Sequence, residues 1–393
     1  MEIRFSDRMG NFEEGIFQAL NEKKNERLAQ GKQVYNLSVG TPDFQPAQHI
    51  IDAVMQAASR PENYKYALAD LPELTEAVIG RFKKRYGVEL APEEIMSVYG
   101  SQEGMTHIGL TLCNPGDRVL VPNPGYPIFS IGPALAGAEL IPYDLLPENQ
   151  FLPDLEGMDE ALLKRVKFMI VSYPMNPIGR TAPRSFYERL IDWAREKEIV
   201  IIHDNAYSDI IYDGREGISI LSVEGAREVC AEFYSLSKSY NYTGARMGFL
   251  AGSKEIVDSF RKLRSQIDYG IFLPVQYGAI AALKGPDDMI REQCAQYQKR
   301  RDALCGGLRS IGWNIPDSEG TMFAWGAIPE KFGADDTAFV MELMEKSGVL
   351  CTPGSSFGSL GRGHVRFALT LPVEQLQEAV RAVEASGILL QAD

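Results

Sequence analysis

The chain has 393 residues, of which 45% are hydrophobic and 24% charged, values typical of a globular protein rather than a disordered one. The formal net charge of -13 opposes a role in binding polyanions, because a phosphate backbone would be repelled. We therefore expect no nucleic-acid partner.

Targeting and metal-binding signals are absent from the sequence pattern. The first residues carry no apolar core of a signal peptide, and no stretch approaches the ~18 uninterrupted apolar residues of a membrane span. Five scattered cysteines without a C-x-x-C pair predict reduced thiols in a cytoplasmic protein. Four widely spaced histidines predict no metal site.

The N-terminal part mixes short elements. Residues 5–30 predict an arm that contains a helix, and residues 34–44 predict a short strand that ends in glycine and proline. Helices are expected over 47–59 and 71–86, with the tyrosine-rich segment Tyr64 to Tyr66 between them.

From Ile95 onward, apolar strands alternate with amphipathic helices, the pattern of a parallel sheet covered on both faces. The predicted strands are 95–99, 118–121, 139–143, 167–173, 199–203, 229–235 and 247–251, and the predicted helices are 102–113, 184–197 and 253–266. We therefore predict an α/β protein whose large domain holds a mostly parallel seven-stranded sheet sandwiched by helices.

The C-terminal part predicts a smaller α+β domain. A linking helix over 287–311 is followed by strands over 321–328, 349–352 and 364–368 and by helices over 335–347 and 372–385. The predicted organisation is an N-terminal arm and part of the small domain (1–45), a large domain (46–285), and the linking helix with the small domain (286–393).

Polar residues follow the ends of the predicted strands, where ligands bind in such sheets. Ser101 and Gln102 open a helix whose free N–H groups suit a phosphate, although Ser101 could be a plain N-cap. Tyr126 could stack on an aromatic ring or simply pack, and Asn176 could donate to an oxygen or form a bare Asn-Pro turn.

Asp204 ends an apolar strand, where a buried carboxylate needs a cation or a strong donor. A protonated pyridine nitrogen would supply one, and Tyr207 would lie near the same ring. The alternative is a helix N-cap at Asp204.

The segment from Phe233 to Phe249 carries the chemistry that the others surround. Lys238 is an amine nucleophile that could hold a phosphorylated aldehyde cofactor as a Schiff base. Arg246 with Ser235 and Ser237 offers a cation and hydroxyl donors for the phosphate.

In this order the motifs Asn176-Pro-Ile-Gly, Asp204-x-x-Tyr207, Ser235-x-Ser-Lys238 and Arg246-Met-Gly resemble those of class I/II aminotransferases. That family belongs to the pyridoxal-phosphate fold type I, or aspartate aminotransferase, superfamily. The resemblance runs from Gly40-Thr-Pro-Asp-Phe to Val365-Arg366-Phe, essentially the whole chain.

The resemblance implies a pyridoxal 5'-phosphate enzyme that moves an amino group from an α-amino acid to a 2-oxo acid by a ping-pong mechanism. Lys238 would form the Schiff base and shuttle the proton, and Asp204 would keep the ring nitrogen protonated. By the same resemblance, Asn176 and Tyr207 would hydrogen-bond the ring oxygen, and Tyr126 would stack on the ring. The phosphate would be bound by Ser101, Gln102, Ser235, Ser237 and Arg246. The substrate carboxylate would be bound by Arg366 with Gly40 and Asn176.

Relatives form homodimers with shared active sites, in which a tyrosine reaches the partner's cofactor phosphate. Tyr66 is the predicted match and Tyr64 the alternative, because Asp70 stands where relatives commonly have glycine. Gly244-Ala245-Arg246 also departs from the common Gly-Trp-Arg.

Several competing functions match parts of the sequence. Ser235-x-x-Lys238 fits the β-lactamase S-x-x-K pattern without its S-D-N partner, and the G-x-S-x-G match at Gly354 runs into a loop. A cofactor-binding regulator would need a DNA-binding segment that this acidic chain lacks. A C–S β-lyase using the same constellation remains the alternative. Dicarboxylate-specific relatives use a second arginine in the segment that corresponds to Asp268 to Phe272, and the absence of arginine there disfavours a dedicated aspartate enzyme. The resemblance around Ser235 to Gly248 and Gly40 to Phe44 instead favours the alanine, aromatic and LL-diaminopimelate branch.

Overall fold

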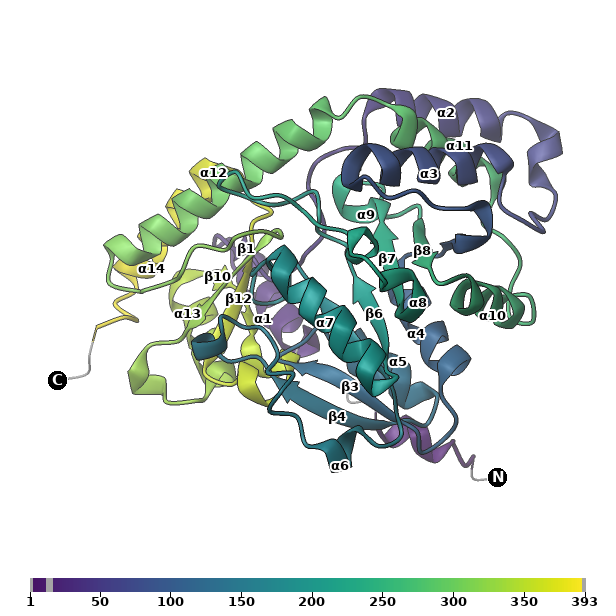
Figure 1. Cartoon of the computed structure of the whole chain (residues 1–393). Coiled ribbons are helices and arrows are strands. Elements are labelled where there is room, and N and C mark those ends of the chain that lie inside the picture. The colour runs from purple at the N-terminus through teal and green to yellow at the C-terminus, as the bar shows by residue number, and fades with distance from the viewer. Residues whose placement is uncertain (1–2, 12–16, 391–393) are drawn as a thin grey trace. The chain divides into compact units, whose positions relative to one another are not determined.

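The computed structural model describes residues 3–11 and 17–390, so the predicted arm over 5–30 is described only in part (Figure 1). The described chain forms two compact units. The larger unit holds Thr41–Gln298 with Ser318–Phe323, and the smaller holds the residues up to Gly40, Lys299–Asp317 and those from Ala324 onward. The predicted domain limits, which fall after residues 45 and 285, stay predictions.

A seven-stranded sheet, in the order β2-β8-β7-β6-β5-β3-β4, forms the centre of the larger unit. All its strands run parallel except β8, which is antiparallel to both neighbours. The predicted mostly parallel sheet is therefore confirmed. Its strands are β2 (Ile95–Val98), β3 (Arg118–Asn123), β4 (Glu139–Asp144), β5 (Val166–Ser172), β6 (Val200–Asp204), β7 (Cys230–Ser235) and β8 (Gly248–Gly252).

Helices cover both faces of this sheet, as continuous apolar strands require. The side chains of Ile202 and Phe233 pack in the core with α4 and α10 residues, while the ring of His203 contacts Tyr187 of α7 on the other face. The helices of this unit are α2 (Gln48–Ala58), α3 (Pro72–Tyr86), α4 (Ser101–Leu112), α5 (Ile128–Leu135), α6 (Glu160–Leu163), α7 (Arg184–Lys197), α8 (Ala226–Val229), α9 (Leu236–Ser239), α10 (Lys254–Arg264) and α11 (Leu273–Lys284).

Five helices of this unit, α5, α6, α8, α9 and α11, are not among the predicted ones. α6, α8 and α9 have only four residues each, too few to show a helical period. α11 packs against α2 and α3 and is apolar on most of its surface, and α5 contains Gly132 and Pro133. Neither helix presents the polar face that produces an amphipathic period, so pattern analysis missed both.

The smaller unit is built from both ends of the chain. β1 (Tyr35–Asn36) pairs in parallel with β10 (Val349–Leu350), and a second sheet has the order β11-β12-β9, with β11 (Thr352–Pro353), β12 (His364–Ala368) and β9 (Phe323–Ala327). Its helices are α1 (Phe17–Ala29), α13 (Asp336–Ser347) and α14 (Val373–Ala385). α12 (Asp288–Ser310) contributes residues to both units.

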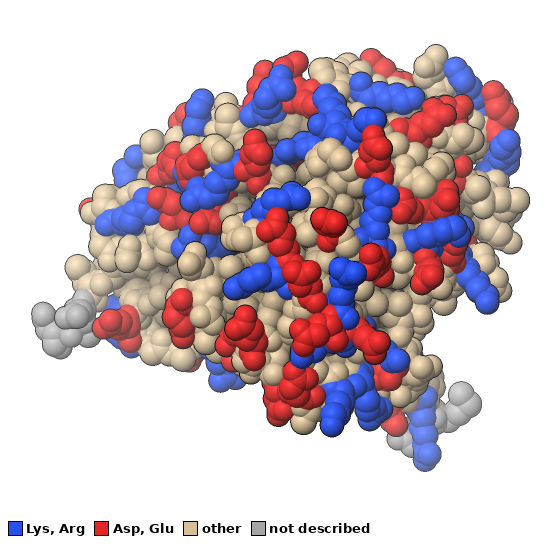
Figure 2. Space-filling view, in the orientation of Figure 1, with Lys and Arg blue, Asp and Glu red and all other residues tan. Residues whose placement is uncertain are grey.

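Acidic and basic side chains are interspersed over the face shown in Figure 2. Among the described residues, no helix combines the length and the apolar character needed to cross a membrane.

Gly104 sets the closeness of α4 to the sheet, because a Cβ placed there would lie 2.3 Å from Cε1 of Phe233. Gly104→Ala should destabilise the protein by ~1–3 kcal/mol despite alanine's better helix propensity. Gly80→Ala in α3, where nothing lies within 4 Å, should instead stabilise by ~0.5–1 kcal/mol. Urea denaturation of both variants measures the change in the free energy of unfolding, which should be negative for Gly104→Ala and positive for Gly80→Ala. A neutral or stabilising Gly104→Ala would contradict the close packing.

Candidate active site

The carboxyl ends of four strands meet in one row of the larger unit. Ser172 at the end of β5 pairs with Asp204 at the end of β6, which in turn pairs with Phe233, two residues before the end of β7. Ser235 pairs with Gly248, and Gly248 with the last residue of β2. Most of the predicted site residues of this unit therefore lie at or just after neighbouring strand ends, where α/β sheets bind ligands. Arg246 instead precedes β8, and Tyr66 precedes α3.

Asp204 is a buried carboxylate with an open hydrogen-bonding position. Only 7% of the residue is exposed, and its Oδ1 has no hydrogen-bond partner among the described residues. Burial raises the Asp204 pKa to about 7, against opposing contributions from His203 and Lys238. The site therefore lacks the full positive charge that an ionised Asp204 requires.

Lys238 lies on the short helix α9 and faces Tyr207. Its Nζ lies 5.9 Å from the centroid of the Tyr207 ring. Ser235 caps the helix, with its Oγ accepting from the Ser237 N–H at 3.2 Å. Gln293 donates to the Lys238 carbonyl at 2.7 Å, a contact that sequence analysis missed because 55 residues separate the two positions.

Arg246 and the start of α4 lie together. The Arg246 guanidinium donates to the Tyr99 carbonyl at 3.4 Å and to the Thr243 carbonyl at 3.0 Å. It makes no ion pair with any described residue. Gly100 has a φ of 83°, and a Cβ on it would lie 2.5 Å from Arg246 Nη2. Glycine therefore allows the cation to approach the N-terminus of α4, which begins at Ser101, and together they can bind an anion.

Two further predicted residues lie after β3 and β5. The Tyr126 hydroxyl donates to Gln102 Oε1 at 3.3 Å, so the ring-stacking candidate is joined to the start of α4. Asn176 is buried in a turn that the Gly179 N–H closes on the Met175 carbonyl at 2.6 Å. The structure thus gives both residues fixed positions in the larger unit.

Arg366 and Gly40 belong to the smaller unit. Arg366 is buried, and its Nη2 donates to the Ser38 carbonyl at 3.0 Å. Its guanidinium lies 4.8 Å from the centroid of the Phe357 ring. The Arg366 side chain therefore contacts the segment that leads to Gly40, and the substrate-binding role of the two residues stays a prediction.

Tyr66 and Tyr64 are both exposed but differ in what their hydroxyls do. The Tyr64 hydroxyl donates to the Ala58 carbonyl at 2.9 Å, whereas the Tyr66 hydroxyl makes no hydrogen bond with a described residue and its ring packs 4.9 Å from Tyr269. Asp70 accepts from the backbone N–H and hydroxyl of Ser97, which ties this segment to β2. Tyr66 is thus the tyrosine with a hydroxyl available to another molecule.

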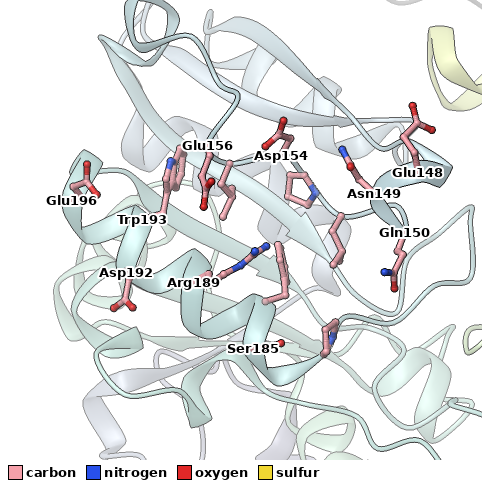
Figure 3. A pocket seen from close by; sticks show the side chains of 15 residues that line it. Glu148, Asn149, Gln150, Asp154, Glu156, Ser185, Arg189, Asp192, Trp193 and Glu196 are labelled. Atoms are coloured by element: carbon pink, nitrogen blue, oxygen red, sulfur yellow. The ribbon is translucent and has the colours of Figure 1, made fainter.

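A groove of about 810 Å³ on the larger unit contains none of the predicted site residues. Figure 3 shows its lining, where Arg189 and Trp193 of α7 lie among the carboxylates of Glu148, Asp154, Glu156, Asp192 and Glu196. The candidate site is therefore defined by the strand ends and not by this hollow.

Curated relatives align over nearly the full chain. LL-diaminopimelate aminotransferase of Desulforudis audaxviator is 40% identical over 375 residues, 95% of each chain. The enzyme of the same name from Aquifex aeolicus is 39% identical over 384 residues, covering 97% of this chain and 99% of that one.

Solved structures agree with these relatives. Substrate-bound BacF from Bacillus subtilis matches with a TM-score of 0.93 at 34% identity over 98% of each chain. A probable N-succinyldiaminopimelate aminotransferase from Thermus thermophilus matches with a TM-score of 0.90 at 32% identity, over 95% of this chain and 100% of that one. The family model for aminotransferase class I and II matches residues 32–383. The chain therefore belongs to the class I and II aminotransferases, pyridoxal-phosphate-dependent enzymes of fold type I.

Proposed function

We propose that this aminotransferase carries out its amino transfer with pyridoxal 5'-phosphate bound at the ends of β2, β5, β6 and β7. The observation that carries the proposal is the buried Asp204 carboxylate, whose open Oδ1 and raised pKa leave a place for a cation. A protonated pyridine nitrogen has the charge and the N–H donor that this position lacks.

The other groups of the site fit the remaining parts of the cofactor. The guanidinium of Arg246 beside the N-terminus of α4 suits the phosphate, with Ser101, Gln102, Ser235 and Ser237 as further donors. Tyr126 suits the face of the ring, and Lys238 supplies the amine that would hold the aldehyde. The donor set therefore matches an aromatic, phosphorylated aldehyde in each of its parts.

When bound, the cofactor supplies an electron sink for the negative charge that develops at the substrate Cα. Lys238 Nζ removes the proton from Cα and delivers it again in the next step. Asp204, in its ionised form, would hold the ring nitrogen protonated. Asn176 and Tyr207 hydrogen-bond the ring oxygen, and Arg366, with Gly40, binds the substrate α-carboxylate. The 2-oxo acid product leaves before the acceptor binds, which gives ping-pong kinetics.

We infer from the names of the curated relatives that the amino donor is LL-diaminopimelate or an α-amino acid of similar shape. The absence of arginine from 268–272 agrees with a donor other than aspartate. Mixing the cofactor-loaded enzyme with single amino acids and following the absorption change of the first half-reaction would identify the donor. Pyruvate release from cystathionine in the same screen would favour the β-lyase alternative instead.

A cytoplasmic location is proposed from the cysteines. All five of them are free, although Cys230, Cys305 and Cys351 are buried in the fold. An oxidising compartment commonly favours disulfides in secreted proteins, so free thiols support a reducing one.

We propose a homodimer with shared active sites, because the larger unit exposes a patch of large apolar side chains. The patch comprises Tyr64, Tyr66, Leu68, Tyr269 and Phe272, each more than 40% exposed. Contiguous exposed apolar side chains commonly mark an interaction surface, and within this patch the Tyr66 hydroxyl bonds to no residue that the structure describes.

Replacing Lys238 should abolish amino transfer. Lys238→Ala removes the amine that both anchors the cofactor and moves the proton, so the first half-reaction should slow by about 10³-fold or more. Lys346→Ala, which removes an exposed α13 lysine paired with Glu342, should leave the rate unchanged. Stopped-flow absorbance measures both. A near wild-type rate in Lys238→Ala would refute the proposed role.

The raised Asp204 pKa predicts a pH-dependent stability difference in the cofactor-free protein. The folded-state pKa of about 7 exceeds the ordinary value of 3.8, so the stability contribution of protonated Asp204 is lost as pH rises between these values. Relative to Asp204→Asn, the wild type should lose roughly 1 kcal/mol per pH unit between about pH 4 and 7. Urea denaturation across this range measures the difference.

The matched control for this titration is Asp192→Asn, which changes an exposed carboxylate of α7. Its stability difference from the wild type measures how much of any pH trend comes from removing one exposed carboxylate of this unit rather than from the Asp204 position. A constant difference for Asp204→Asn would show that Asp204 ionises freely in the fold.

Removing a single hydroxyl tests which tyrosine, Tyr66 or Tyr64, reaches the cofactor of the partner subunit. Tyr66→Phe should weaken cofactor binding by about 10-fold, the cost of losing a hydrogen bond to a charged phosphate. Tyr64→Phe should change binding by less than about twofold, because that hydroxyl donates within its own chain. Fluorescence titration with the cofactor measures both. The reverse pattern would assign the role to Tyr64, and unchanged binding in both would count against a shared site.

A further inference from the structure

Asp209 is a second buried carboxylate in the turn that follows β6, and the proposed reaction makes no direct use of it. Four donors converge on its two oxygens: Arg81 Nη2 at 3.0 Å, Arg85 Nε at 3.1 Å, the Tyr234 hydroxyl at 2.8 Å and the Ser239 hydroxyl at 2.7 Å. The donors come from α3, β7 and α9, so one carboxylate connects three elements to the turn.

The charge of Asp209 is fixed by its partners. Burial alone would raise its pKa, but Arg81 and Arg85 outweigh burial and hold the pKa below its ordinary value. Arg81 is itself buried and also pairs with Asp287 at 2.7 Å. Removing one member of such a group would leave the other charges buried without a partner, which is costly. The group therefore favours a single geometry of these side chains.

Ser239 is the residue that follows Lys238. The helix that carries both, Leu236–Ser239, spans a single turn, and a helix of that length depends on contacts outside itself. Gln293 holds the Lys238 carbonyl at 2.7 Å, and Asp209 holds the adjacent Ser239 hydroxyl. The backbone of Lys238 is therefore fixed from two sides.

The same carboxylate lies five residues after Asp204 and two after Tyr207. The Ile210 N–H donates to the Tyr207 carbonyl at 2.9 Å, so Asp209 lies inside a closed turn that also holds Tyr207. Its bond to Ser239 therefore joins the turn that presents Asp204 and Tyr207 to the helix that presents Lys238.

We propose that Asp209 is a positioning residue that, through the Ser239 hydroxyl, fixes the Lys238 amine relative to Asp204 and Tyr207. This inference rests on the proposed role of Lys238. Because proton transfer requires close and aligned groups, losing this bond should slow the proton step more than it weakens substrate binding. A purely structural ion-pair group would instead lower stability and leave the chemistry of Lys238 unchanged.

The decisive variant is Ser239→Ala, which removes only the linking hydroxyl. In the cofactor-loaded enzyme, kcat should fall about 10-fold while KM changes by less than about threefold. The pH midpoint of the cofactor absorption band, which reports the environment of the Lys238 nitrogen, should shift by about 0.5 units or more. The matched control is Ser347→Ala, which removes a buried serine hydroxyl that donates to Leu343 in α13. It should leave kcat and the midpoint unchanged.

A double-mutant cycle tests the path of the effect. If Asp209 acts on Lys238 through Ser239, the double variant of Asp209→Asn and Ser239→Ala should have a kcat within about twofold of Asp209→Asn alone. Multiplied losses would show that the two residues act separately and would overturn the inference. Should Asp209→Asn fail to fold, Ser239→Ala decides alone: wild-type kcat and a wild-type absorption midpoint refute the positioning role.

Failure of the positioning role and failure of the proposed function give different results. If the wild-type protein develops no pH-dependent absorption band with pyridoxal 5'-phosphate, the cofactor assignment is wrong. If the wild type develops the band and Ser239→Ala titrates identically, only the role of Asp209 is wrong.

Discussion

The site depends on how a carboxylate is accommodated at the end of a buried strand. Asp204 occupies that position in β6, with an open Oδ1 and a pKa raised to about 7 by burial. An ionised carboxylate in such surroundings is costly without a cation. The neighbouring strand ends carry the amine of Lys238 and the groups that we propose for the ring and the phosphate. In the proposed function, the protonated ring nitrogen of the cofactor supplies the positive charge that Asp204 lacks.

Asp209 shows the opposite solution within the same turn. It is as buried as Asp204, but two arginines and two hydroxyls already surround it, and its pKa is lowered. Two carboxylates five residues apart thus differ only in what the fold places beside them. One is satisfied by the protein and can fix the geometry, and the other is left for a ligand.

Close approach of backbone segments brings together the groups that we propose for the phosphate. Gly104 lets α4 lie against Phe233, and Gly100 lets the guanidinium of Arg246 reach the start of that helix. A side chain at either glycine would separate the groups that are to bind the phosphate. In the proposed phosphate site, the contact of the helix terminus with the arginine depends on Gly100, and the seat of the helix on the sheet depends on Gly104.

The sequence by itself predicted the alternation of strands and helices, the mostly parallel sheet and the residues at the strand ends, because apolar periodicity and turn residues are local signals. It missed α5 and α11, which lack a polar face, and the single-turn helices α6, α8 and α9, which are too short to show a period. It also missed the contacts of Gln293 and Asp209 with α9. It left Tyr64 and Tyr66 as alternatives. Only the tertiary structure brought Arg81, Tyr234 and Ser239 to one carboxylate, and only it showed which tyrosine hydroxyl is occupied. Such contacts join residues far apart in the chain, and no local pattern records which donors a buried charge will meet.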